Sequence, residues 1–292
     1  MNPIFSRTFK ALCSIALVGL LSACGASSTV EPFKPTRVVG LGDGFNDPAA
    51  TVNDDTTTHT VVGQVAAYFG QSNILYKAKA GAQIKASAGA PIADLATQIG
   101  DVIANDGGFS ATDLVFIAVG TFDVKAGSNP DTAAQALVTQ VQRLKTAGAK
   151  HILIMPVLDV SRTPWGRVNT STVSTTATNT FNEAVLLALS NAFGGQTPNS
   201  VIYANASGVT SQFLYVTSFA VVSPFTDTGF SSTVVAGTTP ACGNATLFTG
   251  CTSAAANASY TTMLFADGIH LTPAGNRWVA SFLYNATAQG WR

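Results

Sequence analysis

The chain has 292 residues, of which 47% are apolar and only 10% are charged, and its formal net charge is zero. This length is enough for one large α/β domain or two small ones. Nucleic-acid-binding proteins normally carry a basic face, and this charge balance gives no sign of one, so a nucleic-acid partner is not expected.

Residues 1–23 have the pattern of a lipoprotein signal peptide. Arg7 and Lys10 supply a positive start, and the apolar stretch ALCSIALVGLL that follows is too short to span a bilayer comfortably as a permanent helix. The next letters, LSAC, match a lipobox, in which the thiol of Cys24 would receive diacylglycerol; an ordinary cleaved signal peptide with an incidental cysteine is the alternative. The residue directly after Cys24 is Gly25 and not an acidic residue, so retention at the inner membrane is not signalled. We therefore expect an outer-membrane lipoprotein of the cell envelope with a tether over residues 24–36.

Two further cysteines, Cys242 and Cys251, remain in the mature chain with eight residues between them. In an oxidising periplasm this spacing predicts a local disulfide that closes a loop. A metal site would need more ligands, and no His, Asp or Glu lies between the two cysteines. We therefore expect no metal here, and nothing else in the sequence suggests a cofactor.

Apolar runs and helical patterns alternate along the rest of the chain. Strands are predicted at 37–42, 72–78, 112–120, 150–157 and 200–205, and helices at 60–70, 91–106, 129–149, 176–195 and 273–291. This alternation predicts a three-layer α/β/α sandwich around a five-stranded, mostly parallel, doubly wound sheet of the flavodoxin-like kind. No linker divides the array, so residues 37–292 are expected to form a single domain, although segment 207–260 has no assignable pattern.

The stretch DGIHLTPAGN places Asp267 three residues before His270, on a turn that leads into the last helix. This spacing lets a carboxylate orient an imidazole and stabilise its charge, which is the base half of a catalytic triad. The purely structural alternative is a turn at Asp267 followed by a helix start at Thr272 and Pro273.

These residues resemble the SGNH/GDSL hydrolases, a family composed mostly of esterases and lipases, and the resemblance covers nearly all of the mature chain. The closing block of the family is an aspartate, two residues and the catalytic histidine, which DGIHLTPAG matches. The resemblance therefore implies that Asp267 is the orienting acid and His270 the general base. The second block supplies a glycine amide to the oxyanion hole, and Gly81 in YKAKAGA has the matching position.

The opening block departs from the family at the nucleophile. The family has Gly-Asp-Ser, and here Gly42 and Asp43 match, while Gly44 stands where the serine would be. Asp47 falls where a further aspartate is common. Without a serine at position 44, nothing attached to this turn can attack an acyl carbon.

The third block also departs from the family, in which it reads Gly-x-Asn-Asp. Gly120 and Asp123 match, and Phe122 replaces the asparagine that donates to the oxyanion. Loss of one such donor typically costs about 2.7–4 kcal/mol of transition-state stabilisation. An engineered trapping variant would replace the serine alone, so the paired changes at Gly44 and Phe122 indicate natural divergence.

Three functions are compatible with these residues. The first is a catalytically impaired, lipid-anchored family member that binds an acyl ester, an acylated glycan or a partner protein in the old crevice. The second is an active carboxylic-ester hydrolase in which His270, oriented by Asp267, activates water, or which uses an unrecognised nucleophile, with the amides of Gly44 and Gly81 as oxyanion donors. The third is a structural envelope protein whose crevice has no ligand. The paired loss of serine and asparagine favours the first.

Overall fold

The structure is a computed structural model. It describes residues 33–46, 60–77, 91–170, 174–193, 201–203, 225–227, 232–234, 240–241 and 263–291. Residues Lys34–Trp291 belong to one compact unit. The predictions that fall on the signal peptide, on most of the tether and on Cys24, Asp47, Gly81, Cys242 and Cys251 lie outside the described residues.

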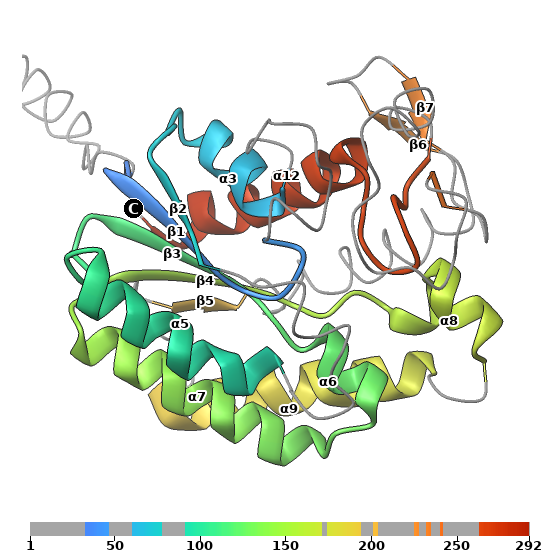
Figure 1. Cartoon of the computed structure of the whole chain (residues 1–292), viewed down its shortest axis with the longest axis horizontal. Helices are drawn as coiled ribbons and strands as arrows, with labels where there is room; N and C mark the ends of the chain where they lie inside the picture. Colours follow the sequence, from blue (N-terminus) through green and yellow to red (C-terminus); the bar gives the residue numbers. More distant parts are fainter. Residues whose placement is uncertain are drawn as a thin grey trace, which may run out of the picture. The chain divides into compact units, whose positions relative to one another are not determined.

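A five-stranded sheet forms the centre of the fold (Figure 1). Its strands are β1 (Arg37–Gly42), β2 (Ile74–Tyr76), β3 (Asp113–Ala118), β4 (His151–Met155) and β5 (Val201–Tyr203). Their order is β2-β1-β3-β4-β5, and every neighbouring pair is parallel. This is the order of flavodoxin-like doubly wound sheets, so the predicted fold class is confirmed.

After a polar first residue, the central strands β1, β3 and β4 are apolar because helices cover both faces of the sheet. All six residues of β3 are buried, and so are five of the six in β1. A parallel strand covered on both faces has no solvent side, so a continuous apolar run replaces the alternating pattern of a half-exposed strand. Such runs were the signal that identified these strands in the sequence.

Two layers of helices flank the sheet (Figure 1). Helices α3 (Val61–Tyr68) and α12 (Pro273–Gly290) pack together on one face. Helices α5 (Pro91–Asn105), α7 (Pro130–Thr146) and α9 (Thr175–Phe193) cover the other. All five predicted helices are present, with boundaries within a few residues of those expected.

Several short elements were not predicted. Helix α6 (Thr121–Ala126) follows β3 and lies between Gly120 and Gly127, which both have a positive φ, so only six residues fit between its start and its stop. Such a short element shows no measurable periodicity. The segment between β4 and α9 contains η3 (Val160–Arg162) and α8 (Pro164–Val168). The unassigned 207–260 segment includes an antiparallel pair, β6 (Phe225–Asp227) with β7 (Ser232–Val234).

Candidate active site

The residues that the motifs single out gather beyond the carboxyl ends of the strands, where doubly wound sheets place their ligands. Asp43 and Gly44 follow β1, and Phe122 and Asp123 lie in α6 directly after β3. The loop of residues 263–272, which we call the base loop, carries Asp267 and His270 and leads into α12.

The turn after β1 is fixed by backbone geometry at Gly42. This residue has φ +115°, and a Cβ there would lie 1.9 Å from the carbonyl oxygen of Ala118, so only glycine fits. Gln98 on α5 holds Gly42 with both ends of its amide. Its Oε1 accepts from the Gly42 N–H at 2.7 Å and its Nε2 donates to the Gly42 oxygen at 2.8 Å. The Asp43 N–H donates to the Ala118 oxygen at 2.8 Å, which ties the turn to β3.

A second buried amide supports the same turn. The Asn46 side chain donates to the Leu41 oxygen at 2.8 Å, and the Asn46 N–H donates to the Asp43 oxygen at 3.1 Å. The Val61 N–H, at the start of α3, donates to the Phe45 oxygen at 3.2 Å. The turn is therefore held to β1, to β3 and to two helices.

In the base loop, Asp267 both forms the turn and contacts the imidazole. Its Oδ1 accepts from the N–H groups of Ile269 at 2.8 Å and His270 at 2.7 Å. Its Oδ2 lies 2.7 Å from His270 Nδ1. A carboxylate can only accept, so we assign the proton to Nδ1, which leaves the lone pair on Nε2. Asp267 therefore forms the turn and contacts the imidazole at the same time, and its catalytic role stays a prediction.

Backbone pairing closes the base loop. Phe265 and Leu271 form an antiparallel bridge, and the Ala266 N–H donates to the His270 oxygen at 2.8 Å. Thr272 caps α12 by accepting from the Gly275 N–H at 3.2 Å, as the Thr-Pro pair in the sequence predicts. These contacts place the imidazole relative to the start of α12.

The imidazole of His270 lies directly over Gly44. A Cβ built on Gly44 would be 2.1 Å from His270 Nε2 and 3.0 Å from Cδ2 and Cε1. The ring is fully buried and has aromatic neighbours from both strand-end turns: Phe45 edge-on at 5.5 Å and Phe122 tilted at 6.3 Å between centroids. A serine side chain at position 44 is therefore incompatible with this position of the ring.

Two further carboxyl groups are buried in the same region, Asp43 at 0% and Asp123 at 1% exposure. Burial raises the pKa of Asp43 to about 7, and the N–H of Phe45 and the charge of His270 oppose that rise. Burial also raises the pKa of Asp123 to about 6. The site thus holds carboxyl groups that titrate near neutral pH beside one imidazole.

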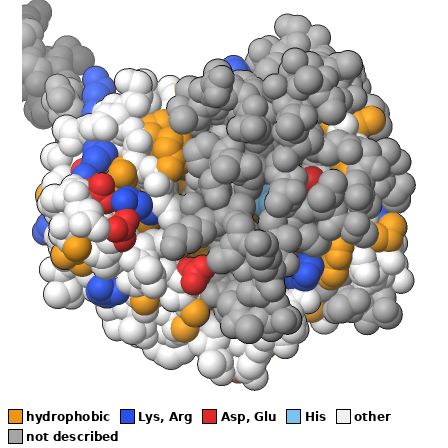
Figure 2. All heavy atoms as spheres, viewed as in Figure 1, with side chains coloured by type: hydrophobic (Ala, Val, Ile, Leu, Met, Phe, Trp, Pro, Cys, Tyr) orange, Lys and Arg blue, Asp and Glu red, His pale blue; other side chains and the backbone are white. Residues whose placement is uncertain are grey.

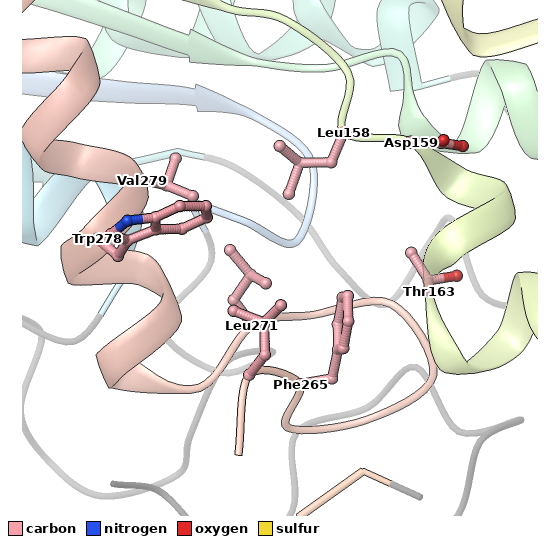
Figure 3. A pocket seen from close by; sticks show the side chains of 8 residues that line it. Leu158, Asp159, Thr163, Phe265, Leu271, Trp278 and Val279 are labelled. Atoms are coloured by element: carbon pink, nitrogen blue, oxygen red, sulfur yellow. The ribbon is translucent and has the colours of Figure 1, made fainter. Parts of the chain in front are cut away.

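A small apolar cavity lies behind the base loop (Figure 3). Its lining includes Leu158, Thr163, Phe265, Leu271, Trp278 and Val279. The volume that the centre of a water-sized sphere can occupy in this cavity is about 10 Å³, which leaves room for about one water molecule. This cavity cannot hold an acyl chain without rearrangement of the side chains around it.

The structure brings together most of the residues that the motifs predict, namely Gly42, Asp43, Gly44, Gly120, Phe122, Asp123, Asp267 and His270. It adds Phe45 and Asn46, which the opening motif contains but which were given no role. Gln98 was also missed, and nothing local could have identified it, because its partner is 56 residues away.

Among the residues with described positions, no three His, Cys, Asp or Glu side chains come together as a metal site. Within the same ranges, no helix combines the length and the hydropathy that crossing a bilayer requires. On the described part of the face in Figure 2, charged side chains of both signs lie near one another.

A family model described as GDSL-like Lipase/Acylhydrolase matches residues 38–283, which includes both the turn after β1 and the base loop. The chain belongs to this family. Membership places the fold within a family of GDSL-like lipases and acylhydrolases. No curated protein sequence matches this GDSL-family chain.

Solved structures give weaker similarities. A member of the lipolytic protein G-D-S-L family from Veillonella parvula is 13% identical, with TM-score 0.47, and 84% of this chain and 94% of that chain are covered. An acetyl xylan esterase is 15% identical, with TM-score 0.49 and coverage of 86% and 98%. LAE5, an α/β hydrolase enzyme from the metagenome of Lake Arreo, is 13% identical, with TM-score 0.47 and coverage of 87% and 95%. We infer function from family membership and the site, not from these similarities.

Proposed function

We propose that this GDSL-family protein is a lipoprotein of the outer membrane that has lost ester hydrolysis and binds an acyl ester or an acylated glycan in the former active site. The observation that carries the proposal is the position of His270 over Gly44, 2.1 Å from where a Cβ would lie. The lipobox ending at Cys24 supports the anchor.

The chemistry of acyl transfer supports the loss of activity. The serine mechanism needs a hydroxyl between the imidazole and the acyl carbon, and donors aimed at the developing oxyanion. Gly44 provides no hydroxyl, and the phenyl ring of Phe122 cannot donate a hydrogen bond. Phe122 instead packs at 6.3 Å from the imidazole, so the position of the asparagine donor is filled by an apolar group.

A second candidate function is ester hydrolysis by activated water. The observation in its favour is the intact pair of Asp267 and His270, with Nδ1 and Oδ2 2.7 Å apart. In this mechanism His270 Nε2 takes a proton from a water whose oxygen attacks the ester carbonyl, and the alcohol leaves with that proton. The ring would have to move away from Gly44 to admit both the water and the ester.

Ester hydrolysis tests the proposal. We would compare the full-length protein with its Gly44→Ser/Phe122→Asn variant on p-nitrophenyl acetate and on acetylated xylan. The native protein is expected to show no turnover, and the variant to gain it, because one change restores the nucleophile while the other restores a donor and removes a ring that packs against His270. Native turnover that depends on His270 would contradict the proposal. A panel of glycans and lipids that never raises the melting temperature would favour a structural role without a ligand.

A further inference from the structure

The chain enters the sheet at the amino ends of the strands, opposite the candidate site at their carboxyl ends. The Thr36 N–H donates to the Thr112 oxygen at 3.0 Å just before β1 begins, and Asp43 follows the other end of that strand. Six residues at about 3.3 Å each place these two points on the order of 20 Å apart. The tether that would carry the lipid therefore meets the domain at the amino ends of the strands.

A cluster of three aromatic side chains lies beside this entry point. Tyr68 ends α3, and shortly after it the Gln71 side chain donates to the Pro35 oxygen at 2.8 Å, so the end of α3 adjoins the incoming chain. Tyr68 is 40% exposed and stacks on Tyr284 of α12 at 5.2 Å. Phe69 contacts the same ring edge-on at 4.9 Å. We call Tyr68, Phe69 and Tyr284 the aromatic cluster.

The composition of this cluster suits the interface of a bilayer. Tyrosine has an apolar ring and a polar tip, and it is enriched where one end of the side chain is apolar and the other is wet. Charged groups at this end of the sheet pair with one another: Lys77 with Asp101 and with Asp106 at 2.8 Å, and Arg37 with Asp113. On the α3–α12 side, the ring of Tyr68 is exposed.

The tether limits how far the attachment point can lie from the membrane. Ten residues, 25–34, separate the modified cysteine from Pro35, and the eleven steps of a fully extended chain between them span at most about 40 Å. Pro35 therefore stays within about 40 Å of the bilayer, and the aromatic cluster, which adjoins it, can reach the lipid headgroups.

We propose that the aromatic cluster rests in the headgroup region of the leaflet that holds the lipid of Cys24, and that the candidate site opens away from that leaflet. This inference rests on the lipid anchor of the proposed function. It also narrows the ligand class, because a site facing away from the leaflet meets acyl esters carried by glycans or other molecules outside it rather than the lipids of the leaflet itself.

Fluorescence quenching by brominated lipid tests the orientation. Full-length lipidated protein is reconstituted in vesicles of phosphatidylethanolamine and phosphatidylglycerol, with or without bromine in the acyl chains. One reporter is Tyr68→Trp. The matched control is Val168→Trp on α8, a side chain 57% exposed on the helix that joins the base loop through the Trp165 N–H and the Gly268 oxygen at 2.9 Å. The signal of the wild-type tryptophans is subtracted from both.

Brominated lipid is expected to quench the fluorescence added by Tyr68→Trp and to leave that added by Val168→Trp unchanged. A second reporter at the exposed Ala67, Ala67→Trp, should behave like the first. Equal quenching of both sides, quenching of the Val168→Trp signal alone, or no quenching in protein that floats with the vesicles would overturn the docking. Wild-type protein that fails to float would instead refute the anchor, so the two failures are distinguishable.

Discussion

His270 Nε2 lies 2.1 Å from the point at which a Cβ on residue 44 would be placed. Real Cβ atoms are essentially never closer than 3.0 Å to such a neighbour. The imidazole therefore does not merely lack its serine; it occupies the space that a serine would need. Asp267 holds the ring there through Nδ1 and holds the loop backbone through two N–H groups.

The first prediction follows from this overlap. Gly44→Ala should destabilise the protein by about 1–3 kcal/mol, the usual cost of overpacking a close-packed interior, measured as the free energy of unfolding in denaturant. In the matched variant with His270→Ala already present, the same change at Gly44 should cost much less. Equal costs in the two backgrounds would show that the ring is not over Gly44.

The second prediction concerns Asp43. Its folded pKa, about 7, is above the usual aspartate pKa of 3.8, so the native state binds a proton that the unfolded state has released, and stability falls as pH rises from about 4 to 7. Asp43→Asn keeps an acceptor for the Phe45 N–H but cannot ionise. Relative to this variant, the free energy of unfolding of the wild type should fall by about 4 kcal/mol between about pH 4 and pH 7.

Chemical denaturation at several pH values measures the difference in unfolding free energy between the wild type and Asp43→Asn. Asp123→Asn should flatten the profile in the same direction but less, because the pKa of Asp123 is raised only to about 6. Parallel pH profiles for the wild type and Asp43→Asn would contradict the assignment of a protonated, buried carboxyl at this position.

The third prediction tests the amide clamp on the turn. Gln98→Leu should leave both backbone groups of Gly42 buried without their partners, at about 1–3 kcal/mol for each. Gln71→Leu is the control, because that side chain also bonds two backbone groups, the Pro35 oxygen at 2.8 Å and the Asn73 N–H at 2.7 Å, but does so nearer the surface. We expect a much larger loss of unfolding free energy for Gln98→Leu, and similar losses would show that the clamp is unimportant.

The fourth prediction concerns the proton on His270. Asp267→Asn can still accept from Ile269 and His270 through Oδ1, but its amide group then faces Nδ1 as a donor. Nδ1 must become the acceptor, and the proton moves to Nε2. Nitrogen NMR of the imidazole should show the change of tautomer while the fold persists. An unchanged tautomer would mean that Asp267 does not set the protonation of the ring.

The main elements of the fold were predictable because each carries its own local pattern. Strand β3 is a continuous stretch of buried residues, and a threonine cap followed by a proline marks the start of α12. Helix α6 was not predictable, since six residues between two positive-φ glycines show no period.

Some features of the candidate site were likewise predictable from local sequence, and others were not. The spacing of Asp267 and His270 predicts their contact, since three residues suffice to close it. The absence of serine at Gly44 is visible in the sequence, but the position of the imidazole over that glycine is not, because it depends on how the base loop packs against the turn after β1. The Gln98 clamp was equally hidden, as it joins α5 to the end of β1.

The central claim is that the site no longer hydrolyses esters, and the most direct test is the rate of p-nitrophenyl acetate hydrolysis by the full-length protein beside its His270→Ala variant. We expect equal rates for the two proteins, at the level of the buffer. Hydrolysis by the native protein that His270→Ala abolishes would contradict the claim, and would mean that the imidazole moves off Gly44 and works as a base without the serine.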